Sequence, residues 1–533
     1  MVWPTEKYDG IAEETHFEGR RVKAYQPRAG TIGELFAATV ERFPGHEALK
    51  EGEKSFTYRE LAEAVKRVAA SLHLRWGVEK GDRVGIITDN CPEYCITLLA
   101  AAVAGAVTVP LNSRFTGDEL EYVINDCGVK VLVVDSPYLS VIDGIRGRIP
   151  GVRHFFATSA AAENYHPWAG LDQEVAGEGL PEGLAGEEDV AIVMYTSGTT
   201  GRPKGAMITH FNLCNNLISV SRTLETKDGE RTLIAVPLFH ITGTMFQFLQ
   251  MISVGGTAVL LRNFKTQSLL DLLAREKITF FIGVPTMYVL ILINPRLKEL
   301  DLGSLKIAAY GGAPMSETTI AQLFEHFPGL RLHNTYGATE TTGSCTMMPS
   351  GQAISRIASI GRPFMVNEIR VMDEKGRELP AGEAGELWIK GPNVVKGYWN
   401  NPQATASEFV DGFWRSGDIG KLDQDGYVYL MDRKKDMINR GGEKIFCVEV
   451  ENAVCSHPKV QEAAVVGVAD QIFGEQVKAV VVPKPGEEIV EGEIQQYLKE
   501  KLADFKIPKY VVVSGELPRN PGGKVIKQLL KNI

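Results

Sequence analysis

A loop rich in glycine, hydroxyl and cationic residues runs from Tyr195 to Gly205, with the sequence Tyr-Thr-Ser-Gly-Thr-Thr-Gly-Arg-Pro-Lys-Gly. Glycines let backbone N–H groups converge on an anion, hydroxyls donate further hydrogen bonds, and Lys204 adds a full positive charge. The apolar run from Val190 to Met194 predicts a buried strand that leads directly into this loop. The composition therefore favours a phosphate-binding loop over an ordinary surface turn.

The loop differs from the two commonest phosphate motifs. A Walker A loop ends in Gly-Lys-Ser/Thr, whereas here Pro203 precedes Lys204 and Gly205 follows it. The GxGxxG spacing of dinucleotide-binding folds is not present in the loop either. The loop instead resembles the signature of the adenylate-forming superfamily. That superfamily includes acyl-CoA synthetases, coumarate-CoA-type ligases, luciferases and the adenylation domains of peptide synthetases.

Further segments match motifs of the same superfamily, in the family's order along the chain. Tyr310-Gly-Gly-Ala-Pro314 and Asn334-Thr-Tyr-Gly-Ala-Thr-Glu340 each follow a run that predicts a strand, and strand ends are where α/β sheets bind ligands. Ser416-Gly-Asp418, the polar run from Asp432 to Lys444, and Leu517-Pro-Arg-Asn-Pro-Gly-Gly-Lys524 complete the set. Each segment alone is typical of turns and linkers, so the identification rests on their shared order.

The resemblance implies that the large lobe of the protein binds ATP. The loop would hold the β and γ phosphates through Thr196, Ser197, Gly198, Thr199, Thr200 and Lys204. The wall beside the adenine and the floor of the acyl pocket would be formed by Gly312, Ala313 and Pro314. A second nucleotide segment would comprise Asn334, Thr335, Tyr336, Gly337, Thr339 and Glu340. In that segment Tyr336 would stack on adenine, Thr339 would contact the α-phosphate, and Glu340 would coordinate Mg²⁺.

The remaining motifs would serve the ribose, CoA and catalysis. Asp418 would accept both ribose hydroxyls, which a carboxylate does more strongly than an amide, and Arg433 would lie at the ribose. By the same resemblance Lys435 is the hinge, and the backbone of Gly441 and Gly442 faces the CoA arm. The catalytic lysine of adenylation would be Lys524.

Strands and helices alternate around these motifs, as in α/β folds. Residues 55–72 predict an amphipathic helix, because Thr57 and Glu60 have capping-box spacing and apolar residues then recur at helical intervals. A second alternation covers 231–335, and short strands separated by turns follow from 360 to about 430. The expected fold is α/β: a large N-terminal lobe of two α/β subdomains plus a small β-barrel-like region, followed by a small mobile α+β C-terminal domain. We expect the lobe to span 1–431 and the mobile domain 432–533, with the hinge near Lys435.

Composition restricts the partners and the location. The net charge is −9 with a pI near 5.7, which argues against nonspecific binding to nucleic acid or to anionic membranes. The longest apolar segment is shorter than a membrane span. The N-terminus does not resemble a secretory signal, the C-terminus is not a peroxisomal address, and we expect the cytoplasm. The seven cysteines form no C-x-x-C pair, and a homodimer is compatible with the sequence.

The segment Pro237-Leu-Phe-His240 resembles the motif at the mouth of the acyl pocket, which implies that His240 gates the pocket. The small residues Thr242 and Gly243 and the apolar run from Phe280 to Pro285 favour a hydrophobic tunnel for a medium- or long-chain fatty acid. An aryl or arylpropenoic acid remains open. A short polar acid also remains open, because the Arg440-Gly-Gly-Glu-Lys-Ile445 variant occurs in ligases for such acids.

Together the motifs predict an ATP-dependent acid:CoA ligase, an acyl-CoA synthetase of fatty acid and lipid metabolism. Its carboxylic acid substrate would attack ATP to give acyl-AMP and pyrophosphate, and CoA would then displace AMP. ATP, Mg²⁺ and coenzyme A are the expected cofactors. Three alternatives stay open: an acyl-AMP ligase that loads a carrier protein, a luciferase-like oxygenase, and a nonenzymatic nucleotide-binding regulator. The regulator would not need Lys524.

Overall fold

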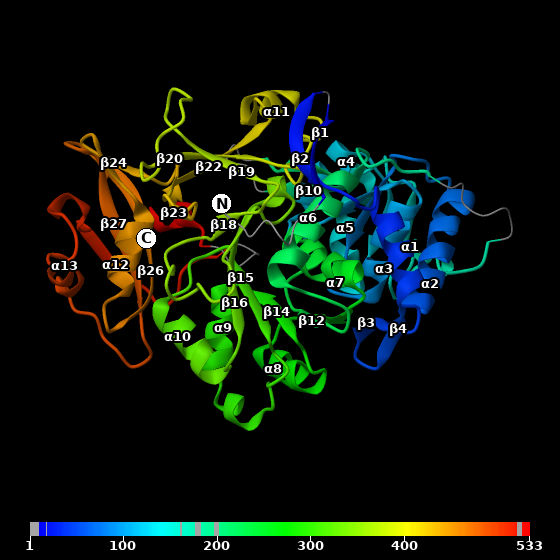
Figure 1. Ribbon diagram of the computed structural model, residues 1–533, viewed down its shortest axis with the longest axis horizontal. Coiled ribbons are helices and arrows are strands. Elements are labelled where there is room, and N and C mark those ends of the chain that lie inside the picture. Colours follow the sequence, from blue (N-terminus) through cyan, green and yellow to red (C-terminus); the bar gives the residue numbers. More distant parts are fainter. Residues whose placement is uncertain (1–9, 18, 160–161, 176–182, 197–201, 520–524) are drawn as a thin grey trace. The chain divides into compact units, whose positions relative to one another are not determined.

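The computed structural model describes residues 10–17, 19–159, 162–175, 183–196, 202–519 and 525–533. The chain divides into two compact units. The first comprises Met1–Glu368 with Ile389–Trp414, and the second comprises Ile369–Trp388 with Arg415–Ile533. Strands and helices alternate along the first unit, as expected for the large α/β lobe (Figure 1).

The first unit contains a seven-stranded sheet that ends at the phosphate loop. Its strands, in spatial order, are β11 (Lys204–Thr209), β10 (Val190–Thr196), β6 (Val107–Pro110), β5 (Arg83–Ile87), β7 (Val129–Val134), β8 (His154–Ala157) and β9 (His166–Pro167). All neighbours are parallel except β10 and β11, which form an antiparallel pair around the loop. The strand predicted before the loop is therefore confirmed as β10.

A nine-stranded sheet forms the second α/β subdomain of this unit. Its order is β18 (Arg362–Pro363), β17 (Thr346–Met347), β16 (Arg331–Tyr336), β15 (Ile307–Gly311), β14 (Phe280–Gly283), β12 (Arg231–Ile234), β13 (Thr257–Leu260), β3 (Glu47–Glu51) and β4 (Lys54–Thr57). The strands from β16 to β3 are parallel, and antiparallel strands close both edges. Parallel strands need cover on both faces, which the helices supply.

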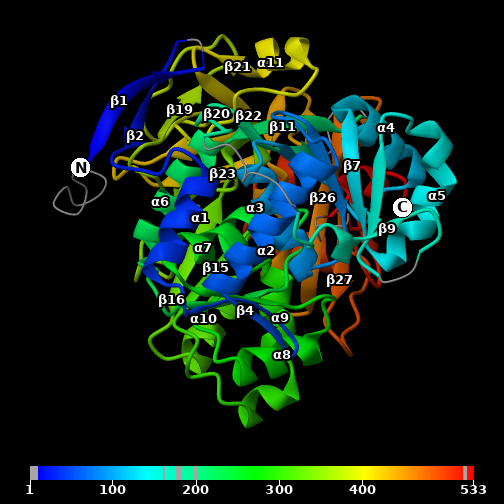
Figure 2. The ribbon, with the colours of Figure 1, turned by 90° about the vertical axis from the view of Figure 1, so that its right-hand side faces the viewer.

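The largest hydrophobic core joins the two sheets through a shared layer of helices. These helices include α1 (Ile32–Arg42), α2 (Tyr58–Ala70), α3 (Pro92–Val103) and α6 (His210–Leu224). The capping box predicted for α2 is present at Thr57 and Glu60, and the apolar face of the helix is buried. The outer face of the nine-stranded sheet is covered by α8 (Thr266–Arg275), α9 (Pro285–Leu292) and α10 (Glu317–His326) (Figure 1). Figure 2 shows α4 (Gly117–Cys127) and α5 (Leu139–Ile145) on the outer side of the seven-stranded sheet.

The second unit contains two β regions. One is formed by β19 (Glu368–Met372), β20 (Gly385–Lys390), β22 (Phe413–Leu422) and β23 (Val428–Arg433), where the short strands were predicted. The other is formed by β24 (Ile438–Arg440), β25 (Glu443–Ile445), β26 (Val460–Asp470), β27 (Gly474–Pro483) and β28 (Tyr510–Val513). This sheet packs against α12 (Cys447–Cys455) and α13 (Glu493–Leu498), and α14 (Lys527–Leu530) follows near the C-terminus. The predicted division at residue 432 stays a prediction.

Two expectations from composition can be compared with the structure. Among the described residues, no helix is both long enough and apolar enough to cross a membrane. All seven cysteines are free thiols, and only Cys455 is exposed.

Candidate functional site

The two ends of the phosphate loop are held in an antiparallel register. Thr196, the last residue of β10, lies opposite Lys204, the first residue of β11, and Tyr195 lies opposite Gly205. A side chain at Gly205 would collide with Val193 and Tyr195, so glycine is required there for close strand packing. The predicted residues Ser197, Gly198, Thr199 and Thr200 lie outside the described residues. Of the residues at the two ends of the loop, Thr196 contacts Glu340 of the second nucleotide segment, and Lys204 lies against Tyr398.

The predicted adenine-side segments leave the same edge of the nine-stranded sheet. Strands β15 and β16 are parallel, with Gly311 opposite Thr335, so Gly312, Ala313 and Pro314 follow one strand beside the end of the other. A Cβ at Gly311 would lie 2.6 Å from the Thr335 carbonyl oxygen, which explains the glycine. Asn334 donates through its side chain to the Ser359 carbonyl at 3.0 Å, a bond that fixes the end of β16. The two segments therefore start from the ends of adjacent parallel strands.

Glu340 lies in a short turn, Thr339–Thr341, immediately after Tyr336 and Gly337. Its side chain is buried, and burial raises the pKa of its carboxyl group. One carboxylate oxygen accepts from the Thr196 hydroxyl at 3.3 Å and contacts the Tyr398 hydroxyl at 3.0 Å. A buried carboxylate whose contacts are hydroxyl groups has a strong affinity for a cation.

Tyr398 connects Glu340 to the phosphate-loop lysine. Its hydroxyl lies 3.0 Å from Glu340 Oε1 and 2.7 Å from Glu408 Oε2. The other oxygen of Glu408 pairs with Lys204 Nζ at 2.5 Å. The lysine Nζ also lies 4.4 Å from the centre of the Tyr398 ring. We call these four residues, Lys204, Glu408, Tyr398 and Glu340, the Tyr398 bridge.

Two buried asparagines hold the Glu340 turn in place. Asn393 donates to the carbonyls of Thr341 and Ser344 at 3.0 and 2.7 Å. Asn216, on α6, donates to the Thr342 carbonyl at 2.8 Å. Neither the Tyr398 bridge nor these asparagines were predicted. Apart from Tyr398 and Glu408, which are 10 residues apart, the contacting residues lie 49 to 204 residues from one another along the chain, so no spacing rule could reveal them.

His240 is accessible to solvent although its neighbours Leu238 and Ile241 are buried, and its imidazole is oriented by its own backbone. Nδ1 accepts from the Thr242 N–H at 3.3 Å, which leaves Nε2 as the ring nitrogen available to a ligand. Desolvation by the surrounding chain lowers its pKa, so the neutral ring is favoured. The segment before it is fastened by Asn90, whose side chain bonds the Val236 carbonyl and the Leu238 N–H.

A π-helix follows His240 at once. It spans Thr242–Leu249 and contains Thr242 and Gly243, the small residues that favoured a hydrophobic tunnel in the sequence. A Cβ at Gly243 would lie 2.4 Å from the Pro237 carbonyl oxygen, so this glycine permits the close turn after His240. π-helical turns are rare and frequently lie at functional sites.

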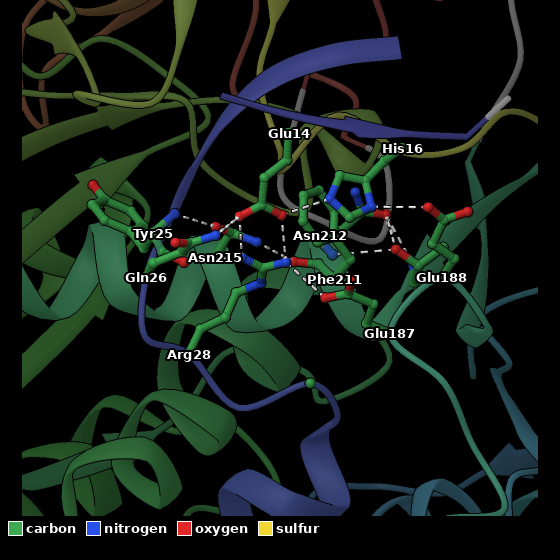
Figure 3. Close-up of polar contacts among 12 residues, drawn as sticks. Glu14, His16, Tyr25, Gln26, Arg28, Glu187, Glu188, Phe211, Asn212 and Asn215 are labelled. Atoms are coloured by element: carbon green, nitrogen blue, oxygen red, sulfur yellow. Dashed lines mark hydrogen bonds and ion pairs between the residues drawn. The ribbon is translucent and has the colours of Figure 1, made fainter. Parts of the chain in front are cut away.

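An N-terminal hairpin, β1 (Ile11–His16) and β2 (Arg20–Tyr25), anchors the start of β10 (Figure 3). His16 contacts Glu14 and Glu188 at 2.8 Å each, and Arg28 bridges Glu14 and Glu187 at 2.7 Å. We call these five residues the hairpin network. Its carboxylates and imidazole have the spacing of a metal site, but the Arg28 guanidinium already takes the place of a cation. The network therefore fixes the strand that leads to the phosphate loop.

The second unit brings the predicted ribose residues together. Asp418 on β22 lies opposite Arg433 on β23, and Arg433 Nε pairs with Asp418 Oδ1 at 2.7 Å. Lys435 is exposed in the turn between β23 and β24. Gly441 and Gly442 form the turn between β24 and β25, both at positive φ, where glycine is favoured. Lys524 lies outside the described residues.

Comparison with known proteins identifies the family. A model of the AMP-binding enzyme family matches residues 36–399, and a model of the AMP-binding enzyme C-terminal domain matches residues 449–524. The chain belongs to the AMP-binding enzyme family. It therefore belongs to the adenylate-forming superfamily, as its motifs predicted.

Similar AMP-binding enzymes include ligases for different acids. The chain is 38% identical to a feruloyl-CoA synthase of Amycolatopsis over 91% of this chain and 95% of that protein. It is 34% identical to the long-chain-fatty-acid–CoA ligase FadD13 of Mycobacterium tuberculosis, over 89% and 92% of the two chains. The crystal structure of ATP-bound MatB from Rhodopseudomonas palustris matches with a TM-score of 0.85 and 34% identity, covering 94% of this chain and 98% of that chain. The predicted CoA ligase branch and fold are confirmed.

This AMP-binding enzyme is an AMP-forming acid–CoA ligase that uses ATP, Mg²⁺ and CoA. The Glu340 region fits the metal, because Mg²⁺ binds oxygen ligands and this buried carboxylate has hydroxyl neighbours. Relatives of the enzyme include both aryl and fatty acid ligases, so the predicted fatty acid is not confirmed.

Proposed function

We propose that this ligase converts an aryl or arylpropenoic acid to its CoA thioester. The observation that carries this proposal is the 38% identity to a feruloyl-CoA synthase over nearly the full length of both chains. A medium- or long-chain fatty acid is the second candidate, supported by the 34% identity to FadD13. In either case the same residues of the nucleotide site activate the carboxylate.

The first half-reaction must overcome repulsion between two anions. The substrate carboxylate attacks the α-phosphorus of ATP, the bond to the bridging oxygen breaks, and acyl-AMP and pyrophosphate form. In our proposal Thr196 and Lys204 hold the departing β and γ phosphates. At about 4 Å, an opposite charge contributes roughly 4 kcal/mol at an effective dielectric near 20, so placed cations dominate this step. Mg²⁺ held by Glu340 would supply further charge neutralisation at the phosphates.

The remaining predicted residues would bind the nucleoside. Tyr336 would stack on adenine beside Gly312, Ala313 and Pro314, and Thr339 would contact the α-phosphate. Asp418 would accept the ribose hydroxyls with Arg433 beside it. The ion pair between these two residues supports that role, because it orients the carboxylate.

His240 would act at the mouth of the acyl pocket. Its Nε2 would donate a hydrogen bond to the carboxylate of the acid, since its Nδ1 already accepts from Thr242. The lowered pKa of the ring supports a neutral donor that does not itself need to titrate near neutral pH.

The second half-reaction would use a different face of the C-terminal region. The CoA sulfur attacks the acyl carbonyl, the thiol proton is lost, and AMP leaves. We propose that Lys524 serves adenylation and that rotation about Lys435 then brings Gly441 and Gly442 to the CoA arm. The exposed position of Lys435, in a turn between two strands, supports a hinge there.

Measuring the two half-reactions separately tests the catalytic assignment. Lys524→Ala should abolish acid-dependent ATP–pyrophosphate exchange while thioester formation from supplied acyl-AMP persists. Exposed Lys531→Ala, seven residues further on, is the matched control and should change neither reaction. Equal loss of both half-reactions in Lys524→Ala would refute the assignment.

Thiol-dependent AMP release across a panel of acids tests the substrate. Ferulate and related aryl acids should give a higher kcat/KM than fatty acids of any length, with CoA as acceptor. A preference for a fatty acid would favour the second candidate. A preference for a phosphopantetheinylated carrier protein over CoA would instead indicate an acyl-AMP ligase.

A homodimer and a cytoplasmic location remain part of this proposal. Sedimentation analysis of the purified enzyme would test the first, and cell fractionation with an antibody would test the second.

A further inference from the structure

The cation of the phosphate loop already has an anionic partner within the protein. Lys204 is largely buried, with 12% of its side chain exposed, and its Nζ lies 2.5 Å from Glu408 Oε1. A phosphate oxygen of ATP would compete for the same ammonium group. Any phosphate bound through Lys204 must therefore weaken or replace the contact with Glu408.

The position of Glu408 makes this contact exchangeable. Glu408 is the last residue of α11 (Pro402–Glu408), at the helix end where the partial charge is negative, so the helix itself does not stabilise the carboxylate. Its side chain is 31% exposed, and water can solvate it when Lys204 leaves. The Glu408 carboxylate is thus paired with Lys204 in the nucleotide-free protein, and water can replace Lys204 as its partner.

Tyr398 makes the contact part of a larger arrangement. Its backbone N–H donates to Thr405 Oγ1 at 2.9 Å, and its segment pairs with β11 through the bond from Trp399 N–H to the Gly205 carbonyl at 2.7 Å. The tyrosine is thus fixed to both α11 and the strand that carries Lys204. Its hydroxyl has one proton and two carboxylate neighbours, Glu340 and Glu408, at 3.0 and 2.7 Å.

We propose that Glu408 is a positioning residue that substitutes for nucleotide phosphate at Lys204, and that Tyr398 connects this substitution to Glu340. The proposal rests on the roles of Lys204 and Glu340 given under the proposed function. Before ATP arrives, Glu408 neutralises Lys204 and keeps the ammonium within the site. When phosphate binds, Lys204 exchanges one anion for another, and Glu408 becomes solvated.

Exchange also helps the product to leave. Pyrophosphate is a highly charged product that Lys204 would retain, and return of Glu408 to the ammonium offsets part of that attraction. The carboxylate should therefore weaken the binding of both ATP and pyrophosphate in the intact enzyme. It should also speed release of pyrophosphate after adenylation.

Binding of pyrophosphate, measured by calorimetry with the full-length enzyme and no acid present, tests the proposal. Glu408→Gln keeps the side-chain shape and removes the competing charge, so it should bind pyrophosphate about fivefold more tightly. The matched control is Asp411→Asn, which removes an exposed carboxylate three residues further along, at a positive φ that Asn tolerates. It should change pyrophosphate affinity by less than about twofold.

A double-mutant cycle with Lys204→Ala separates this inference from the proposed function. Lys204→Ala alone should weaken pyrophosphate binding about tenfold or more, and Glu408→Gln should have no effect in that background. If Lys204→Ala binds pyrophosphate normally, the proposed phosphate role of Lys204 fails. If Lys204→Ala weakens binding but Glu408→Gln does not tighten it in the wild-type background, only the role of Glu408 fails.

Steady-state kinetics give a readout that a merely structural role would not move. Glu408→Gln should lower the KM for ATP and strengthen inhibition by pyrophosphate, without a parallel rise in kcat. Tyr398→Phe keeps the ion pair between Lys204 and Glu408 but removes the hydroxyl. It should also lower the KM for ATP and strengthen inhibition by pyrophosphate, by smaller factors. A raised KM for ATP in both variants would overturn the proposal, because it would mean that Glu408 supports ATP binding.

Discussion

Two polar networks in the first unit use the same residue types in opposite ways. In the hairpin network, the Glu14 carboxylate is hydrogen-bonded to the side chains of Arg28, His16 and Gln26. Its pKa falls from 4.5 to about 2, chiefly because of the hydrogen bond with Arg28. In the Tyr398 bridge, Glu340 contacts two hydroxyls, and burial raises its pKa. One glutamate has a permanent cation within the protein, whereas the other is held among neutral donors.

The two glutamates therefore differ in what they can offer a ligand. A carboxylate with a guanidinium partner stabilises the fold and has little left to offer a ligand. A buried carboxylate without such a partner destabilises the fold near neutral pH, and a bound cation would relieve that cost. Substitutions in the two networks should therefore change stability in opposite directions.

The largest expected effect is on adenylation by Glu340→Gln. Loss of the carboxylate should lower acid-dependent ATP–pyrophosphate exchange by about 10²–10³-fold, because charge stabilisation at the phosphates is lost. Without ligands the same variant should melt at a higher temperature than the wild type. Glu14→Gln is the control, and its exchange rate per folded molecule should stay within about threefold. Similar losses of activity in Glu340→Gln and Glu14→Gln would contradict the different roles of the Tyr398 bridge and the hairpin network.

The next largest effect is on the stability of the hairpin network. Arg28→Met leaves Glu14 and Glu187 without their shared cation and should lower the free energy of unfolding by about 2–3 kcal/mol in urea titrations. The double variant Arg28→Met with Glu14→Gln should recover part of the loss. An unchanged urea midpoint in Arg28→Met would mean that the network contributes no net stability.

The two glutamates should also give opposite pH dependence. The folded pKa of Glu14 is depressed, so its stabilisation is present above pH 4.5 and is lost as pH falls towards 2; by pH 4 the loss should be about 1 kcal/mol. Glu14→Gln should remove this part of the acid dependence. The folded pKa of Glu340 is raised, so its charge costs stability as pH rises through that pKa, and Glu340→Gln should flatten that part of the profile. Urea titrations from pH 4 to pH 7 would measure both slopes.

The smallest effect should come from an exposed pair on the same hairpin. Arg21 and Glu13 lie 2.7 Å apart, but their side chains are 73% and 62% exposed. Arg21→Ala should therefore change the free energy of unfolding by less than about 0.5 kcal/mol. A larger loss would mean that proximity alone, without burial, stabilises the hairpin.

The sequence predicted features that depend on neighbouring residues. The capping box of α2 requires only Thr57 and Glu60. The strand before the phosphate loop requires only a short apolar run, so local sequence determines both features. Motif resemblance assigned Asp418 and Arg433 separately to the ribose, and the strand register brings the two residues together.

Features that depend on distant segments could not be predicted in this way. Glu408 contacts Lys204, which lies 204 residues earlier in the chain. The segment that contains Glu408 has only the pattern of a short helix that begins at Pro402. The hairpin network likewise joins Glu14 and Arg28 to Glu187, from a stretch that reads as an acidic connector. The acid specificity stayed open for another reason, because a wall of small and apolar residues is compatible with several acids of similar polarity.

The π-helix after His240 can lose a residue without moving the helix that follows it. A π-helical segment carries one more residue than an α-helical segment of the same number of turns. Deleting one residue within Thr242–Leu249 would restore α-helical winding, because the wide turns accommodate the extra residue, and the helix that follows, α7 (Gln250–Val254), would keep its orientation. Because Asn90 holds the chain ahead of His240, such a change would leave the preceding strand in place. A single deletion there would therefore change which side chains the segment after His240 presents, with the strand before it and the helix after it left in place.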